Sequence, residues 1–371
     1  MSEKIVILTT VHQPFDTRIF YKQAKSLIEA GYHEVTLIAQ YNRNEIIEGV
    51  KIISLSKPRN RIARMLQITC QAFCLACKEN AALYHFHDPE LISVGMLLKL
   101  KGKRVIYDVH EDLPKQILSK EWIPKPLRRL VAGAARVAEA VASRAFDGIV
   151  AATPAIARRF PSNKTVVVQN FPILNELITP ESIPYQQRPA KIVYVGGITA
   201  IRGIREMVQA MSLLPESLSD TRLVLAGEFS PPTLESEVRC LPGWDHVEFL
   251  GWQDRASVAR LLWEARIGLV ILHPRPNYLE AWPVKLFEYM SAGLPVIASD
   301  FPLWREIVDG IGCGLLVNPL DPKAIAEAIQ YLLTHPDEAE EMGRRGRQAV
   351  QERYNWDIEK EKLLSLYRRL V

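Results

Sequence analysis

The chain has 371 residues, enough for two domains that each bury their own hydrophobic core. Hydrophobic residues make up 48% and charged residues 24%, which is normal for a soluble globular protein. The net charge of +4 is too small to indicate a nucleic-acid partner, although it weakly favours anionic small molecules or an anionic membrane surface.

Targeting signals are not expected. The N-terminus, MSEKIVILTT, enters a strand after a very short apolar run, so it does not resemble a signal peptide, and no apolar stretch approaches the length of a membrane span. Five cysteines without a disulfide-framework spacing fit a reducing compartment. The sequence therefore predicts a cytoplasmic protein.

Short β-branched runs alternate with longer amphipathic segments, which is typical of parallel sheets covered by helices. In the first half, strands are predicted at 4–10, 34–40, 50–55, 82–88, 104–110, 148–153 and 164–170. A helix is predicted over 17–30, where Ile19, Phe20, Ala24, Leu27 and Ile28 share one face.

The composition changes at residues 173–190, where several prolines without any period predict an interdomain linker. A second alternating series follows, with strands predicted at 191–197, 222–228, 247–252, 267–272, 295–300 and 314–318. Helices are predicted at 203–214 and 284–292, and the chain is expected to be helical from residue 322 onward. Two doubly wound α/β halves make a ligand crevice the default expectation.

The most informative segment is NYLEAWPVKLFEYMSAGLPVIASD, in which seven residues separate Glu280 from Glu288. Pro283 suits the first turn of a helix, which would place Glu288 inside that helix and Glu280 in the loop before it. Free backbone N–H groups at the helix start, from Val284 onward, and the charge of Lys285 would favour a phosphate there.

This segment resembles the E-x7-E region of the retaining glycosyltransferases of family 4, which have the GT-B fold. The resemblance implies two Rossmann-like domains that face each other across a cleft, followed by a helical tail. Its domains would be an acceptor domain at 1–172, the linker at 173–190 and a donor-nucleotide domain at 191–352. The C-terminal helix, 353–371, is expected to pack back on the N-terminal domain. The resemblance further implies that Glu288 binds the ribose of the nucleotide, and that Glu280 contacts the donor sugar.

A second part of the resemblance lies in YVGGITAIRGIREM, which follows the first strand of the second half. Gly196 and Gly197 let the backbone approach a ligand closely, and Arg202 suits a diphosphate. The family commonly has an arginine directly after the first glycine, where this chain has Gly197. Diphosphate binding is therefore expected to depend more on Arg202, Lys285 and helix N-termini.

In the first half, VHQPFDTRIFYKQAKSL resembles the loop and helix that open many of these enzymes. Asp16 and Arg18 are predicted on the acceptor side or in the cleft, although Asp16 suits a helix N-terminus equally well and Arg18 a surface position. His110 matches the active-site histidine of the family, which implies contact with the donor sugar. His87 and Asp88, at the end of an earlier strand, are interpreted as residues that shape the site or support the fold.

Two further patterns suggest metal ions, and both are rejected. His85, His87 and Asp88 resemble ligands, but successive strand residues point to opposite faces, so His85 and His87 share a face only with each other. Cys70, Cys74 and Cys77 have the C-x3-C-x2-C spacing of an iron–sulfur motif. Within a predicted helix these cysteines would share one face, interpreted as a buried stripe. No metal and no cofactor are expected.

The resemblance implies a hexosyltransferase-type enzyme that moves a sugar from a nucleoside diphosphate sugar to an acceptor hydroxyl, with retained anomeric configuration. Saccharides or lipid-linked saccharides are the expected acceptors, in cell-surface polysaccharide or glycolipid synthesis. Basic and apolar residues mix in KPRNRIARMLQ, which holds Arg59, Arg61 and Arg64, and in KPLRRLVAGAARV. Both segments suit peripheral contact with the inner face of an anionic membrane, or ordinary solvated helices equally well.

Two alternatives remain open from sequence: an epimerase of similar fold that acts on nucleotide sugars, and an inactive homologue that only binds nucleotide. The glycine at position 197 favours the inactive homologue, whereas the retained Glu280, Glu288, Arg202, Lys285 and His110 argue against it. A nicotinamide-dependent oxidoreductase is disfavoured because the chain contains no G-x-G-x-x-G motif.

Overall fold

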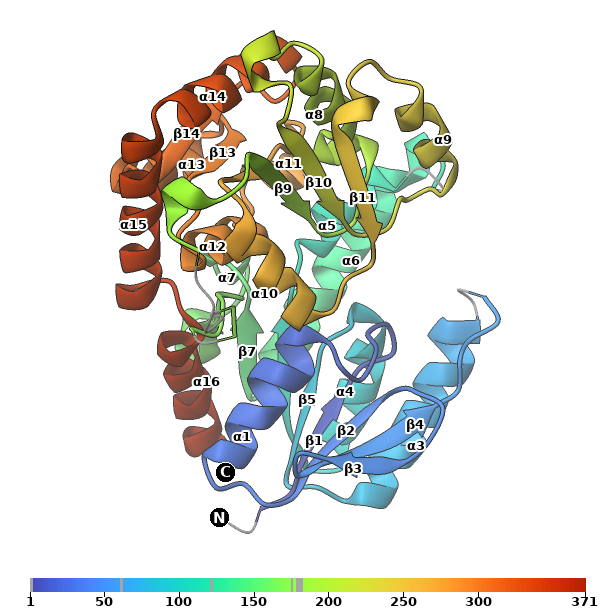
Figure 1. Ribbon diagram of the computed structural model, residues 1–371. Coiled ribbons are helices and arrows are strands. Elements are labelled where there is room, and N and C mark those ends of the chain that lie inside the picture. Colours follow the sequence, from blue (N-terminus) through green and yellow to red (C-terminus); the bar gives the residue numbers. More distant parts are fainter. Residues whose placement is uncertain (1–2, 61–62, 121–122, 175, 178–182) are drawn as a thin grey trace. The chain divides into compact units, whose positions relative to one another are not determined.

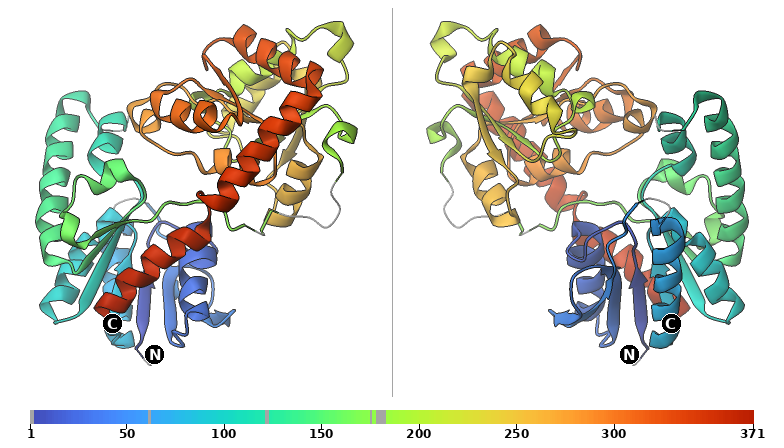
Figure 2. Two further views of the ribbon diagram at one scale, coloured as in Figure 1. Left: turned by 90° about the vertical axis from the view of Figure 1, so that its left-hand side faces the viewer. Right: turned by 90° about the vertical axis from the view of Figure 1, so that its right-hand side faces the viewer.

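The computed structural model describes residues 3–60, 63–120, 123–174, 176–177 and 183–371 (Figure 1). Arg61, one of the basic residues predicted to contact a membrane, lies outside these ranges. Contacts divide the chain into two units, which are described separately: residues 1–170 with 356–371, and residues 171–355. Each unit contains one sheet with helices on both faces (Figure 2).

The sheet of the first unit has eight strands, in the order β3-β4-β2-β1-β5-β6-β7-β8. Their bounds are β1 Ile5–Leu8, β2 Val35–Gln40, β3 Glu45–Ile47, β4 Val50–Leu55, β5 Leu83–Phe86, β6 Arg104–Val109, β7 Gly148–Ala151 and β8 Thr165–Val167. The pairing of β3 with β4 is antiparallel and the others are parallel. The seven strands predicted from sequence are present, and β3 was missed because this short edge strand has no buried residue to give it a pattern.

The first unit has one long connecting helix and several short ones. They are η1 Thr17–Ala24, α1 Lys25–Glu29, η2 Arg64–Ile68, α3 Thr69–Glu79, η3 Pro89–Leu91, α4 Ile92–Leu100, α5 Leu113–Ser119, α6 Lys125–Ala145, α7 Pro154–Ala157 and η4 Ser162–Lys164, together with the final helix, α16 Trp356–Leu370. The helix predicted over 17–30 begins as a π-helix, η1, before it continues as α1. Because α16 belongs to this unit, the two ends of the chain complete one domain (Figure 2).

The two faces of the first sheet differ in chemistry. One face is apolar, with Val6, Leu8, Tyr84, Phe86 and Tyr107 in its core. The opposite face, which η1 and α16 cover, carries buried polar residues at the ends of β5 and β6. Trp356 anchors the start of α16 there, because its indole Nε1 donates to Ser26 Oγ at 2.9 Å.

The second unit has a six-stranded parallel sheet in the order β11-β10-β9-β12-β13-β14. Its strands are β9 Lys191–Val195, β10 Arg222–Ala226, β11 Val247–Gly251, β12 Ile267–Val270, β13 Val296–Ser299 and β14 Gly314–Val317, all at predicted positions. Counted within the unit, the order is 3-2-1-4-5-6, that of a Rossmann fold. Alternate residues feed two cores, one on each face of the sheet.

Helices flank this sheet on both faces. They are α8 Ile204–Met211, α9 Thr233–Arg239, α10 Arg255–Glu264, α11 Pro276–Leu279, α12 Val284–Ser291, α13 Pro302–Ile311, α14 Pro322–Thr334 and α15 Pro336–Glu352, with 3-10 turns η5 Tyr185–Gln187, η6 Ala200–Arg202, η7 Glu216–Leu218 and η8 Trp244–His246. The helices predicted at 203–214 and 284–292 correspond to α8 and α12. The helical end predicted from residue 322 corresponds to α14, α15 and α16.

The linker predicted at 173–190 is not a separate segment where the structure describes it. Phe171, Leu177 and Tyr185 are buried in the cores of the second unit, because this stretch supplies apolar side chains between its prolines. Residues 175 and 178–182 of the predicted linker lie outside the described ranges. The second unit therefore starts at residue 171 and ends at residue 355.

The cysteine segment forms the expected helix, α3, but the predicted burial is wrong. Cys70 and Cys74 are exposed and Cys77 is half-buried, whereas Ala72 and Ala76 face the core. The smaller alanines allow the helix to approach the sheet on that side. No helix of the described ranges is both long enough and apolar enough to span a bilayer.

Candidate functional site

The strand order of the first unit places a topological switch point between β1 and β5. The connections from β1 and from β5 run to opposite sides of the sheet, and a crevice forms at such a switch point outside the carboxyl ends of the strands. The loop after β1 carries His12 and Asp16, β5 is followed by His87 and Asp88, and His110 follows β6. The first-half residues predicted from sequence therefore gather at one edge.

Asp88 holds the loop after β1 in place. Its Oδ2 accepts hydrogen bonds from Thr9 Oγ1 at 2.8 Å, from the Thr10 amide at 2.6 Å and from the Val11 amide at 3.2 Å. The residue is only 3% exposed. Asp88 therefore fixes the conformation of this loop through buried hydrogen bonds.

Asp16 is the N-cap of η1, because its Oδ1 accepts from the amides of Arg18 at 2.8 Å and Ile19 at 3.0 Å. Its other oxygen lies 3.1 Å from Nδ1 of His12, whose ring stacks on His110 with 5.5 Å between centroids. The hydrogen bond to Asp16 raises the pKa of His12 above 6.5, against the effect of burial. His12 was not predicted from the sequence, although a histidine four residues before an N-cap aspartate was a usable signal.

Asp108, on β6, is the buried charge at the centre of this region, and sequence analysis missed it as well. Arg18 Nη2 donates to both of its carboxylate oxygens, at 3.0 and 3.2 Å, and Gln23 Nε2 donates at 2.6 Å. Burial alone would raise the pKa of Asp108, but Arg18 and the nearby histidines hold it well below 3.8. Arg18, predicted in the cleft or on the surface, is instead buried with Asp108, because a carboxylate this deep needs a cationic partner.

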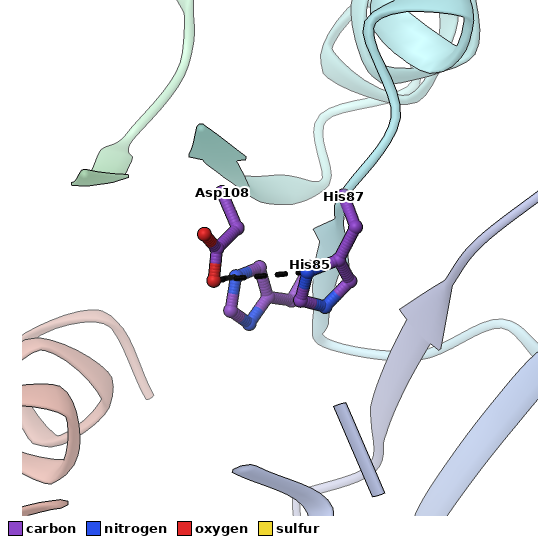
Figure 3. Close-up of side chains that lie close together, drawn as sticks. All are labelled: His85, His87 and Asp108. Atoms are coloured by element: carbon purple, nitrogen blue, oxygen red, sulfur yellow. Dashed lines mark ion pairs between the residues drawn. The ribbon is translucent and has the colours of Figure 1, made fainter. Parts of the chain in front are cut away.

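Three histidines surround Asp108. Polar atoms of His85, His87 and Asp108 lie within 4.8 Å of one another (Figure 3). His85 Nε2 is 3.5 Å from Asp108 Oδ2, and His85 Nδ1 is 2.6 Å from the hydroxyl of Tyr367 in α16. His87 Nδ1 lies 2.8 Å from His110 Nε2. The interpretation that His85 and His87 share a face only with each other is therefore wrong, because parallel pairing of β5 with β6 brings Asp108 beside them.

This cluster fits a metal ion poorly. Arg18 and Gln23 already donate to Asp108, and the guanidinium charge 3.0 Å from the carboxylate would repel a cation. Tyr367 and His110 each contact one imidazole nitrogen of the remaining pair. The geometry is that of a hydrogen-bonded network around a buried anion.

In the second unit, a glycine turn and two cations meet after β9, beside the switch point with β12. Gly196 has a φ of +116°, which favours glycine, and a Cβ there would lie 3.6 Å from Lys285 Nζ. A Cβ at Gly197 would lie 3.0 Å from Arg202 Nη1, which donates to the Gly197 carbonyl at 3.0 Å. The absent side chains leave both cations close to bare backbone.

Lys285 is the unusual member of this group. Its Nζ is buried, lies 3.6 Å from the centre of the Tyr194 ring and has no hydrogen-bond partner among the described residues. Burial, reinforced by the charge of Arg202, puts the pKa of Lys285 well below 10.5. A buried ammonium without a hydrogen-bonded acceptor is costly, and this arrangement favours the binding of an anion.

The start of α12 adds donors beside Lys285. Pro283 is the N-cap and not the first helical residue as predicted, because its ψ of 122° is extended. The amides of Val284 and Lys285 begin the helix, where backbone N–H groups lack intrahelical acceptors. Their position at the positive end of the helix dipole favours an anion.

The two predicted glutamates lie in different surroundings. Glu288, within α12, accepts from Arg255 Nη1 at 2.8 Å, and Arg255 also forms a bidentate pair with Glu176 at 2.8 Å. Glu280 is the exposed C-cap of α11. Arg255 was not predicted from the sequence, since no pattern near residue 255 marked it.

Two family models match successive parts of the chain. Residues 17–170 match the glycosyl transferase 4-like domain, and residues 175–349 match glycosyl transferases group 1. The chain is a group 1 glycosyltransferase. This family is the one that the resemblance predicted, so the prediction of a glycosyltransferase enzyme is confirmed.

Relatives of this glycosyltransferase are distant. The phosphatidyl-myo-inositol mannosyltransferase of Mycobacterium leprae is 23% identical over 76% of the chain and 72% of the relative. Several other curated relatives are matched over only 40–48% of their own length.

Solved structures share the whole fold of this glycosyltransferase. Sucrose-phosphate synthase from Thermosynechococcus elongatus has a TM-score of 0.79 and 24% identity, with 99% of both chains covered. Anabaena HepE in complex with UDP-glucose has a TM-score of 0.72 and 14% identity, with 99% of this chain and 100% of that chain covered. The predicted GT-B fold, two Rossmann-like domains with a helical C-terminal tail, is confirmed.

The shifted pKa values of His110 and His12 should make the stability of this glycosyltransferase depend on pH. Burial lowers the pKa of His110 from 6.5 to about 4, so between these values the unfolded chain binds more protons than the folded chain. Stability should therefore fall as the pH falls from 6.5 toward 4, and His110 should account for about 1–3 kcal/mol of this loss. Urea unfolding at a series of pH values, with hydrogen exchange of β1 and β6, measures the effect, which should be smaller in His110→Gln.

His12→Gln is the matched control. In the wild type, the raised pKa of His12 contributes stability that is present below pH 6.5 and is lost as the pH rises through the pKa of the folded state. This variant should therefore lose stability more steeply on acidification than the wild type. Parallel curves for wild type and His110→Gln would contradict the assignment of a lowered pKa.

Proposed function

We propose that this glycosyltransferase uses a nucleoside diphosphate sugar as donor, retains the anomeric configuration and needs no metal ion. The observation that carries the proposal is the buried, unpartnered ammonium of Lys285 beside Gly196. Arg202 and the first amides of α12 add positive potential at the same place. HepE, a structural relative, binds UDP-glucose, which further supports a nucleotide-sugar donor.

The chemistry follows from the charge that develops on the leaving group. When the glycosidic bond to the diphosphate breaks, negative charge builds on the phosphate oxygens, and a fixed cation in a buried position stabilises it strongly. Lys285 and Arg202 are the proposed diphosphate ligands, and Glu288 is the proposed ribose ligand. The leaving phosphate would take the proton of the acceptor hydroxyl, so this route requires no protein nucleophile.

Lys285→Met should change stability and binding in opposite directions. Removal of an uncompensated buried charge should stabilise the free protein by about 1–3 kcal/mol, because methionine fills a similar volume. The same change should weaken nucleoside diphosphate binding at least about tenfold, since one charge-assisted contact is lost. Thermal unfolding with UDP, GDP and ADP, each with and without EDTA, measures both effects.

In the wild type, the matching nucleotide at a hundredfold its Kd should stabilise the protein by about 2.7 kcal/mol, with or without EDTA. Lys323→Met is the control, because Lys323 is an exposed lysine of the same unit. It should change neither stability nor binding. A nucleotide shift that EDTA abolishes would overturn the metal-free proposal, and undiminished binding by Lys285→Met would remove Lys285 from the site.

Glu288→Ala should lower turnover about a hundredfold, because a carboxylate that binds ribose hydroxyls makes charge-assisted hydrogen bonds. Turnover is measured with sugar derivatives of the nucleotide that the thermal panel identifies. Glu237→Ala, which removes an exposed glutamate paired with Arg205, is the control and should leave turnover unchanged. Unchanged turnover in folded Glu288→Ala would exclude Glu288, and an inverted anomeric proton signal in the product would overturn retention.

We further propose that the acceptor is lipid-linked and that α6 contacts an anionic membrane. Apolar side chains recur along its exposed face at separations of three, four and seven residues: Leu127, Leu130, Val131, Val137 and Val141. Leu130 is 70% exposed and Val137 is 63% exposed. Basic residues accompany them on the same helix: Lys125, Arg128, Arg129, Arg136 and Arg144. An apolar stripe with neighbouring positive charge suits the surface of an anionic bilayer.

The membrane proposal predicts binding to vesicles that contain phosphatidylglycerol at low salt, weaker binding at high salt and little binding to phosphatidylcholine alone. The double variant Leu130→Ser, Val137→Ser should bind several-fold more weakly, because it removes apolar area that would enter the lipid. Leu100→Ser is the control, since Leu100 is 82% exposed at the end of α4. Vesicle co-sedimentation measures binding, and equal binding by both variants would contradict a role for α6.

A further inference from the structure

The side chain of His87 lies between Asp108 and His110, and its two ring nitrogens have different surroundings. Nδ1 is 2.8 Å from His110 Nε2 and 3.7 Å from Asp108 Oδ2. Nε2 is buried and has no hydrogen-bond partner among the described residues. The residue as a whole is 2% exposed.

This difference determines where the proton of His87 resides. Burial puts the pKa of His87 well below 6.5, so the ring is neutral and carries one proton. A proton on Nε2 would leave a buried N–H without an acceptor, whereas a proton on Nδ1 can be donated to His110. Buried donors without partners are rarer in proteins than buried acceptors without partners. His87 therefore donates from Nδ1 to Nε2 of His110.

The same hydrogen bond fixes the tautomer of His110. Its Nε2 accepts, so the single proton of the neutral ring must be on Nδ1. That nitrogen makes no hydrogen bond to any described residue, and the side chain of His110 is 22% exposed. We propose that His87 is a positioning residue that fixes His110 in the Nδ1-protonated tautomer, so that His110 presents an N–H donor, and not a base, at the carboxyl edge of the first sheet.

The ligand for this donor is an oxygen atom, and its identity as a sugar oxygen rests on the function proposed above. A histidine with this tautomer cannot take a proton from an acceptor hydroxyl through Nδ1. It can hydrogen-bond a sugar hydroxyl and orient it. The inference thus excludes His110 as the general base of the reaction.

Groups from neighbouring elements keep the Asp108 carboxylate in one position. The Tyr367 hydroxyl lies 2.6 Å from His85 Nδ1, and His85 Nε2 lies 3.5 Å from Asp108 Oδ2. Arg18 and Gln23 fix the same carboxylate from η1. Asp108 is therefore anchored on several sides, and His87 packs against a charge that stays in place.

The decisive test is direct observation of the tautomer in protein labelled with 15N-histidine. The chain has eight histidines, and His110→Gln assigns the signal of His110 by its loss. Long-range proton–nitrogen correlations at pH 7 should show Nδ1 of His110 protonated and Nε2 unprotonated. In His87→Leu, which cannot donate, the proton of His110 should move to Nε2, 3.5 Å from Asp108 Oδ1. His87→Asn keeps a donor near the position of Nδ1 and should restore the Nδ1-protonated form.

Turnover provides the second measurement. His87→Leu should lose about tenfold, as expected for one lost hydrogen bond to the sugar, and His87→Asn should recover most of that loss. A proton on Nε2 of wild-type His110, or on Nδ1 in folded His87→Leu, would overturn the proposal. If His87→Leu does not fold, the wild-type and His87→Asn spectra decide. The expected tautomer without sugar transfer would refute the proposed function while this inference stands.

Discussion

The buried carboxylate of Asp108 is the charge around which the first unit is organised. A lone carboxylate in this position would be too costly to bury, so groups from several elements compensate it. Arg18 and Gln23 come from η1, His85 from β5, and Tyr367 reaches the network through His85 from α16. The requirement to satisfy one anion thus ties the start, the middle and the end of the chain to the same sheet.

The two units treat buried charge in opposite ways. In the first unit, the charge of Asp108 is neutralised by Arg18 within the protein, so the network serves to position side chains at the sheet edge. In the second unit, Lys285 packs against the face of an aromatic ring near both Arg202 and Glu288, but its ammonium has no hydrogen-bond partner among the described residues. A bound anion would stabilise a buried ammonium in this position, which is the physical basis of the ligand role proposed for Lys285.

Sequence patterns predicted the architecture well, because the strands and helices of a parallel α/β fold each have a characteristic local periodicity of apolar residues. Every predicted strand is present, and only β3, a short exposed edge strand, was missed. The site was predicted less completely. Sequence patterns predicted Arg18 and Glu288 as site residues, but not their partners Asp108 and Arg255, because these contacts run between strands and helices that are distant in sequence and no local spacing records them. The error over Cys70 and Cys74 has a similar origin, since a helical stripe shows which residues share a face and not which face is buried.

The position of Tyr367 also bears on how the protein is made. His85 precedes the second unit in the sequence, whereas its hydrogen-bond partner, Tyr367, follows the whole of that unit. Until α16 leaves the ribosome, the polar face of the first sheet lacks its cover, so the first unit is completed only after the second unit has been synthesised.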